Sequence, residues 1–175
     1  NGNLDDIVTV SETALADMDP AGSTADLQVG EEISVEDLLY CMMLSSANEA
    51  CNVAAEYVSG SIDAFVALMN ERAAELGCTG THFANPHGLH EEDHYTTAMD
   101  LARITEEALQ NKTFYQICTT TDYVVPVTNL SEERTLHTTN YLVSDSMTSD
   151  YYYARAAGVK TGFTTPAGRC LITTA

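Results

Sequence analysis

Basic residues are scarce in this chain, and long apolar runs are absent. Seven Lys and Arg stand against 26 Asp and Glu, giving a formal net charge of −19 over 175 residues. Such a negative field repels phosphate backbones, so we expect no nucleic-acid partner. No stretch approaches the roughly 18 apolar residues of a membrane span. The first residues lack the features of a secretory signal and an initiator methionine, so we expect a processed or excised piece.

Cysteine is present in an odd number and without the Cys-x-x-Cys spacing that is typical of zinc or redox sites. Three of the five cysteines, Cys41, Cys51 and Cys170, lie in apolar stretches, where a free thiol usually acts as a small buried hydrophobe. We therefore expect free thiols. Such thiols suit a cytosolic protein or an exported one from a habitat with little oxidant, and the pattern does not choose between them.

The chain is long enough for one domain with a sizeable core. Apolar periodicity and capping residues predict helices over 35–44, about 49–58, 61–76 and 97–111, with one more helical turn at 113–118. Strands are expected at 4–10, 122–128, 157–163 and 169–174, and loops at 17–32, 78–96 and 129–153. Helices come first and strands last, so the pattern predicts an α+β arrangement in which a helical cluster packs against a small antiparallel sheet.

Two short motifs carry candidate chemistry. Ser46-Ala47-Asn48 separates two apolar helices and offers a hydroxyl and an amide, while Lys160-Thr161-Gly162 ends a strand and offers a cation, a hydroxyl and a small residue. Ser-x-Asn alone is weak, since it arises by chance in about every second chain of this size, whereas Lys-Thr-Gly arises in roughly a few per cent. A polar helix break and an exposed strand end are the simpler alternatives.

The order of these motifs resembles that of the serine D-alanyl-D-alanine carboxypeptidases, the low-molecular-mass penicillin-binding proteins of the peptidase S11 family. The resemblance runs through nearly the whole chain. It is carried by residues 39–50 around Ser-x-Asn, by 81–89 and 95–101, by 158–164 around Lys-Thr-Gly, and by 167–170. Four ordered matches are much more specific than any one of them.

The resemblance implies the β-lactamase/transpeptidase-like fold, with a helical subdomain against an antiparallel sheet. It also implies hydrolysis of peptidoglycan stem peptides that end in D-Ala-D-Ala, through an acyl-serine intermediate. Expected partners are that pentapeptide and, for the intact protein, β-lactam antibiotics. No cofactor or metal is implied. The intact protein would work outside the cytoplasmic membrane, in the cell envelope, either secreted or anchored.

Residue roles follow from the same resemblance. Ser46 would pass a proton to the leaving amine, Asn48 would hold the substrate amide, and Lys160 would share the proton network and attract the terminal carboxylate. For substrate binding, Thr161 would donate to that carboxylate and Gly162 would let the strand lie along the peptide.

Two further positions complete the expected substrate-binding set. The N–H of Phe163 would be one oxyanion donor. His87 would line the mouth of the site.

One element of the family pattern is absent. Neither lysine of the chain lies three residues after a serine, so the Ser-x-x-Lys that supplies the nucleophile and its base is not present in residues 1–175. We expect residues 1–175 to be a single partial domain that lacks the N-terminal Ser-x-x-Lys segment and the C-terminal strand and helix. As printed, the chain should neither be acylated by penicillin nor release D-alanine. A non-catalytic cell-wall-binding or interaction module with the same fold is the alternative.

Two further expectations concern metal and self-association. His90-Glu91-Glu92-Asp93-His94 matches the zinc-protease pattern His-Glu-x-x-His, which needs both histidines on one helix face. Pro86, Gly88 and the surrounding polar residues favour a loop instead, so zinc is a minor alternative. A sheet without its outer strands exposes backbone edges, so we also expect pairing with another copy or with the missing segments.

Overall fold

The computed structural model describes residues 2–16, 18–145 and 150–175. The helices are α1 Glu12–Leu15, α2 Val35–Leu44, α3 Asn48–Ser59, α4 Ile62–Glu75, α5 Ala98–Ala108 and α6 Lys112–Thr119. The strands are β1 Ile7–Thr9, β2 Glu32–Ser34, β3 Asp122–Val125, β4 Arg134–His137, β5 Val159–Thr164 and β6 Gly168–Thr173. They form three two-stranded antiparallel sheets, β1–β2, β3–β4 and β5–β6.

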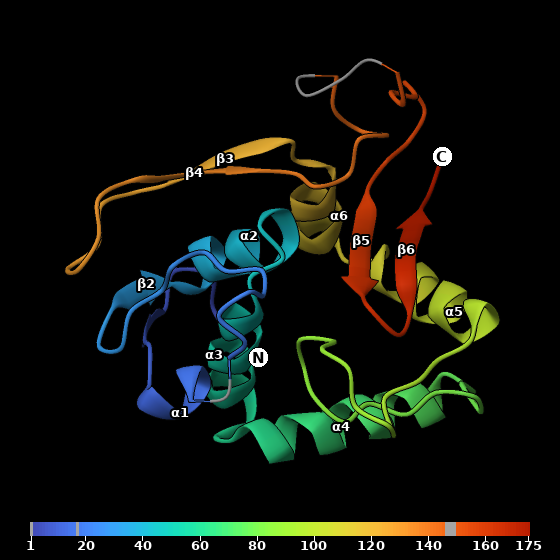
Figure 1. Ribbon diagram of the computed structural model, residues 1–175, viewed down its shortest axis with the longest axis horizontal. Coiled ribbons are helices and arrows are strands. Elements are labelled where there is room, and N and C mark those ends of the chain that lie inside the picture. Colours follow the sequence, from blue (N-terminus) through green and yellow to red (C-terminus); the bar gives the residue numbers. More distant parts are fainter. Residues whose placement is uncertain (1, 17, 146–149) are drawn as a thin grey trace.

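Helix α2 is the centre of the core. It starts where the Ser34 hydroxyl accepts the N–H of Asp37, which satisfies one of the free donors of the first turn. Leu38, Cys41 and Leu44 recur at helical spacing and are at most 1% exposed. Helices α3 and α6 and strands β2–β4 contact α2, while α1 packs on α3 and β1 pairs with β2 (Figure 1). The polar loop between α2 and α3 is thereby held on a rigid support.

An ion pair ties two segments that lie far apart in sequence. Glu31, just before β2, is fully buried, and both of its oxygens accept from the Arg134 guanidinium at the start of β4, at 2.6 and 2.8 Å. The Thr128 hydroxyl and the Gln28 N–H also donate to this carboxylate. Burial acts to raise the pKa of Glu31, but these hydrogen bonds outweigh burial and hold the pKa below its usual value.

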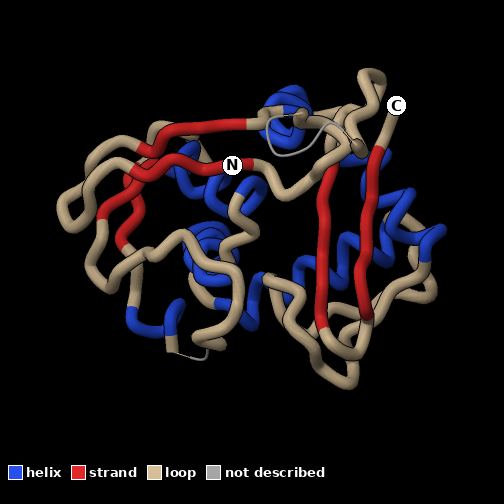
Figure 2. Tube along the Cα trace, turned by 45° about the horizontal axis from the view of Figure 1, so that its top comes forward, coloured by secondary structure: helices blue, strands red, loops and turns tan. Residues whose placement is uncertain are grey.

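Strands β5 and β6 form a hairpin with a continuous register from Val159↔Thr173 to Thr164↔Gly168. The hairpin lies beside α5 and α6, away from α1 and β1–β2 (Figures 1 and 2). Gly158, immediately before β5, has a φ of +78°, and a Cβ there would lie 2.8 Å from the Cys118 carbonyl oxygen. Only glycine therefore lets β5 begin this close to the end of α6.

The predicted helices are all present, and the predicted strands differ mainly at their ends. Three elements were missed: α1, β2, and β4 inside the expected loop 129–153. The segment 113–118 is a helix of eight residues, α6, rather than a single turn. Pro126 directly follows β3, consistent with its inability to donate to a ladder. Residues 146–149 of the expected loop lie outside the described part of the chain.

No helix among the described residues is long and apolar enough to cross a membrane.

Candidate active site

Ser46 lies in the break between α2 and α3. Helix α2 ends at Leu44 with Ser45 as its C-cap, the N–H of Ala47 returns to the Cys41 carbonyl at 3.2 Å, and α3 begins at Asn48. Ser46 has a φ of +57°, a left-handed conformation that is costly for a residue with a Cβ. Such strain recurs where a side chain is held in position for function.

Lys160 reaches the same point from β5. Its Nζ atom donates to Ser46 Oγ at 2.7 Å and to the Thr161 carbonyl at 2.8 Å. Burial lowers the pKa of Lys160 from its ordinary value, and the nearby Cys51 thiol opposes this shift only in part. A lysine with a lowered pKa beside a serine hydroxyl is suited to exchanging a proton with it.

Asn48 is the first residue of α3 and is 8% exposed. Its Nδ2 atom lies so near Gly22 that a Cβ at position 22 would approach it to 2.7 Å. Within the described part of the chain its carboxamide makes no side-chain hydrogen bond, and it lines a cavity of about 270 Å³ beside Glu49 and the segment before β2. The amide can therefore still bind a ligand, but neither Ser46 nor Lys160 lines this cavity.

The segment opposite Asn48 is held by a buried carboxylate. Glu49, 3% exposed, accepts the Thr24 hydroxyl at 2.7 Å and the Ala25 N–H at 2.8 Å. The N–H of Asn48 donates to the Ser23 carbonyl at 3.0 Å. These bonds fix one wall of the cavity against the N-terminus of α3.

Thr161, Gly162 and Phe163 follow Lys160 along β5. Gly162 is exposed, and a Cβ there would meet only the Cys170 Cβ, at 4.0 Å. The fold itself thus leaves room for a side chain at this position. Phe163 is 67% exposed, with the Arg169 guanidinium 5.8 Å from its ring centroid. The Thr161 hydroxyl lies beside that of Thr139.

His87 lies in the loop 78–96, where it was expected, and its ring Nδ1 accepts the Leu89 N–H at 3.2 Å. Burial lowers the pKa of His87, and the neighbouring His94 adds to the effect. Its hydrogen bond is made within its own loop and not to Ser46 or Lys160. The structure therefore does not join His87 to that pair.

The zinc-protease pattern is not on a helix. Residues His90–His94 are loop, as predicted, and the His94 ring accepts the Ala84 N–H at 3.2 Å. Among the described residues no cluster of three or more His, Cys, Asp or Glu could hold a metal ion. The geometry that zinc hydrolysis needs is not formed by His90, Glu91 and His94.

Two residues near the site were not identified from the sequence. Cys51 lies one turn into α3, close enough to Lys160 to affect the pKa of that lysine, and its i,i+3 spacing from Asn48 could have indicated it. Thr139 contacts Thr161 from the segment expected as loop, and no pattern in the sequence indicates this contact.

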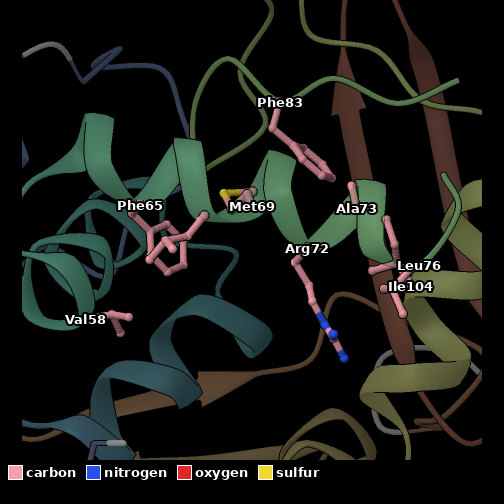
Figure 3. Close-up of a pocket in the computed structure, with 9 residues that line it drawn as sticks. Val58, Phe65, Met69, Arg72, Ala73, Leu76, Phe83 and Ile104 are labelled. Carbon is pink, nitrogen blue, oxygen red and sulfur yellow. The ribbon is translucent and has the colours of Figure 1, made fainter. Parts of the chain in front are cut away.

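A separate apolar groove of about 390 Å³ lies along α4 (Figure 3). Its walls come from α3, α4, α5 and the segment between α4 and α5. The lining residues are Val58, Phe65, Leu68, Met69, Arg72, Ala73, Leu76, Phe83 and Ile104. None of the residues expected to bind substrate lines it.

A helical cluster, an antiparallel hairpin, and a hydroxyl–amide loop that meets a Lys-Thr-Gly strand define the β-lactamase/transpeptidase-like class of folds. Within that class the chain belongs to the D-alanyl-D-alanine carboxypeptidase family, peptidase S11, whose model matches residues 2–175. The predicted α+β fold class is confirmed by the solved structures that resemble it.

Relatives resemble the chain over nearly all of its length. It is 38% identical over 173 residues to D-alanyl-D-alanine carboxypeptidase DacF of Bacillus subtilis, covering 98% of this chain and 41% of that protein. It is 36% identical over 184 residues to the D-alanyl-D-alanine carboxypeptidase of Streptomyces sp. K15, covering 98% of this chain and 60% of the relative.

Among solved structures, the Streptomyces K15 DD-transpeptidase superposes with a TM-score of 0.84 at 34% identity, over 99% of this chain and 68% of that one. A D-alanyl-D-alanine carboxypeptidase from Mycobacterium tuberculosis gives 0.81 at 29% identity, over 96% of this chain and 60% of that one. The chain thus spans about two fifths to two thirds of the length of these proteins.

Proposed function

We propose that the whole protein is a serine-type D-alanyl-D-alanine carboxypeptidase acting on peptidoglycan stem peptides through an acyl-serine intermediate. We further propose that the residues described above form its substrate-binding and proton-transfer side. The observation that carries this proposal is the 2.7 Å hydrogen bond from Lys160 Nζ to Ser46 Oγ, which joins the two motifs in one site.

In this proposal the peptide lies along β5. Among the described strands β5 pairs with β6 along one edge only, so the other edge has backbone groups free to bind an extended peptide. Gly162 lets that peptide approach closely, the Thr161 hydroxyl donates to its terminal carboxylate, and the Phe163 N–H stabilises the oxyanion. The positive charge of Lys160 attracts the same carboxylate.

Proton transfer would use the Ser46–Lys160 pair. When the attacking serine has formed the tetrahedral intermediate, the D-alanine amine must gain a proton to leave. The Ser46 hydroxyl supplies this proton and regains one from Lys160, whose lowered pKa eases the exchange. Asn48 holds the substrate amide so that the leaving nitrogen faces Ser46. In this proposal His87 lines the mouth of the substrate site, although its hydrogen bond is made within its own loop.

The nucleophile itself is assigned to a Ser-x-x-Lys outside residues 1–175, since these residues contain no such motif. The proposal places the whole protein in the cell envelope, where its substrate is, and makes β-lactams its covalent inhibitors. It predicts that the printed chain alone is not acylated by labelled penicillin. Covalent label on a serine of this chain, Ser46 included, would overturn the assignment.

The test uses the protein encoded by the full coding sequence. We expect it to release D-alanine from an acyl-L-Lys-D-Ala-D-Ala peptide and to be labelled by penicillin. Lys160→Met should lower kcat/KM by a factor of about 100 or more, the scale of lost acid–base catalysis. Lys112→Met is the matched control, because Lys112 is the other lysine and is exposed on α6. Absence of D-alanine release by the wild-type protein would refute the proposal.

A further inference from the structure

Thr139 provides a hydroxyl at the edge of the proposed site. Its Oγ1 atom lies 2.5 Å from Oγ1 of Thr161, although 22 residues separate the two along the chain. Thr139 is exposed and Thr161 half-buried. Within residues 2–16, 18–145 and 150–175, no second hydrogen bond reaches either hydroxyl.

The position of Thr139 is fixed by its neighbours. The next residue, Asn140, is 4% exposed, and its Nδ2 atom donates to the Gly158 carbonyl at 3.0 Å. The N–H of Thr138, on the other side, donates to the Thr121 carbonyl at 2.8 Å. Thr139 is therefore anchored to the residue before β5 and to the segment between α6 and β3, and its hydroxyl is held at Thr161.

The hydroxyl pair of Thr139 and Thr161 can donate a hydrogen bond to a ligand as well as form its own. Two hydroxyls carry two protons, and the hydrogen bond between them uses one. When Thr139 donates to Thr161, the Thr161 proton remains for a ligand, and accepting a hydrogen bond makes Thr161 a stronger donor. Without Thr139 the Thr161 hydroxyl would rotate freely and would be less well directed.

We propose that Thr139 is a positioning residue that directs the Thr161 hydroxyl toward the terminal carboxylate of the substrate. It thereby contributes to the preference for peptides with a free C-terminus. This inference rests on the proposed function, because it assigns a carboxylate to Thr161. Thr139 acts through Thr161 and takes no part in the proton transfer between Ser46 and Lys160.

The test compares two substrates of the full-length protein, acyl-L-Lys-D-Ala-D-Ala and the same peptide with an amidated C-terminus. Thr139→Val keeps the shape of the side chain but removes the hydroxyl. It should lower kcat/KM for the free carboxylate about 5- to 20-fold, mainly through KM, because the hydrogen bond from Thr161 to the carboxylate is weakened. The kcat/KM for the peptide with an amidated C-terminus, which reacts more slowly, should change less than about twofold.

Two further variants separate positioning from folding. Thr139→Ser retains the hydroxyl and should restore kcat/KM for the free carboxylate to within about threefold of wild type. Thr135→Val on β4 is the control, since Thr135 is an exposed threonine away from Thr161. This substitution should not change kcat/KM for either substrate. Thermal unfolding of each variant, followed by circular dichroism, verifies that the fold is kept.

The outcomes distinguish the two proposals. If wild type releases no D-alanine from either peptide, the proposed function fails and this inference falls with it. Suppose that wild type is active and that Thr139→Val lowers kcat/KM equally for both substrates, or for neither. The positioning role of Thr139 is then refuted, while the proposed function stands. The positioning role is also refuted if Thr139→Ser does not restore kcat/KM for the free carboxylate.

Discussion

Lys160 Nζ lies 2.7 Å from Ser46 Oγ, across 114 positions of the sequence. Neither helix α2 nor strand β5 alone can create this contact. It depends on the packing of the hairpin β5–β6 against α6, which in turn packs on α2. The site is therefore sensitive to the scaffold as well as to its own side chains.

Lys160 should give the stability of the chain a specific pH dependence. Its folded pKa is lowered, so between that lowered value and the ordinary value of about 10.4 the unfolded chain binds more protons than the folded one. The contribution of Lys160 should thus make the free energy of unfolding increase as the pH rises through this window. Urea unfolding at several pH values should show a steeper rise for wild type than for Lys160→Met. Equal slopes would contradict the lowered pKa.

The buried Glu31–Arg134 pair, which joins the segment before β2 to β4, should be important for the free energy of unfolding. Arg134→Leu leaves a buried carboxylate without its partner and should cost about 3–5 kcal/mol in the free energy of unfolding. Replacing Glu31 as well, by Leu, should recover much of this loss. The control is Arg72→Leu, which breaks exposed pairs with Glu75 and Glu107 and should lower the free energy of unfolding far less. Similar losses in the two single variants would refute the distinction.

Gly158, just before β5, and Gly162, in the Lys-Thr-Gly motif, should respond differently to substitution by alanine. Gly158→Ala introduces a Cβ at φ +78° against the Cys118 carbonyl and should lower the free energy of unfolding by about 2 kcal/mol or more. Gly162→Ala should leave stability within about 1 kcal/mol but weaken peptide binding, because its Cβ would point into open space along β5. Chemical denaturation and peptide titration measure both effects. A Gly162→Ala variant that binds as wild type would contradict the role of that edge.

Thiol reactivity should follow burial. The structure describes all five cysteines as free thiols, with Cys170 exposed. Burial raises the pKa of Cys41 to about 12, and burial likewise raises the pKa of Cys51 to about 12, so both are almost entirely protonated at pH 8. Iodoacetamide at pH 8, followed by peptide mass spectrometry, should label Cys170 before either of them. Faster labelling of Cys51 would indicate that Lys160 activates it.

Local patterns in the sequence were sufficient for helices α2–α6 and for the hairpin that carries Lys-Thr-Gly, but not for the short helix α1. Ser34, Ser61 and Thr97 cap their helices as nearby residues indicate, because capping depends on a few neighbouring positions. Strand β4 was missed because its partner β3 and the Arg134–Glu31 pair that fixes it are long-range contacts. Its own composition is polar and resembles a loop.

The same division applies to the site. Ser46, Asn48 and Lys160 were identified through their motifs, because each motif is contiguous in the chain. Thr139 was missed, since its contact with Thr161 joins two segments that are distant in the sequence. The resemblance of the motifs to a known family supplied the expected roles, and these roles remain proposals.

A double-mutant cycle on the full-length protein tests the central claim most directly. Ser46→Ala, Lys160→Met and the double variant would be compared by kcat/KM for D-alanine release from acyl-L-Lys-D-Ala-D-Ala. If the two side chains act as one proton-transfer unit, the double variant should be about as slow as the slower single variant. Losses that multiply would show that Ser46 and Lys160 act independently and would contradict the account.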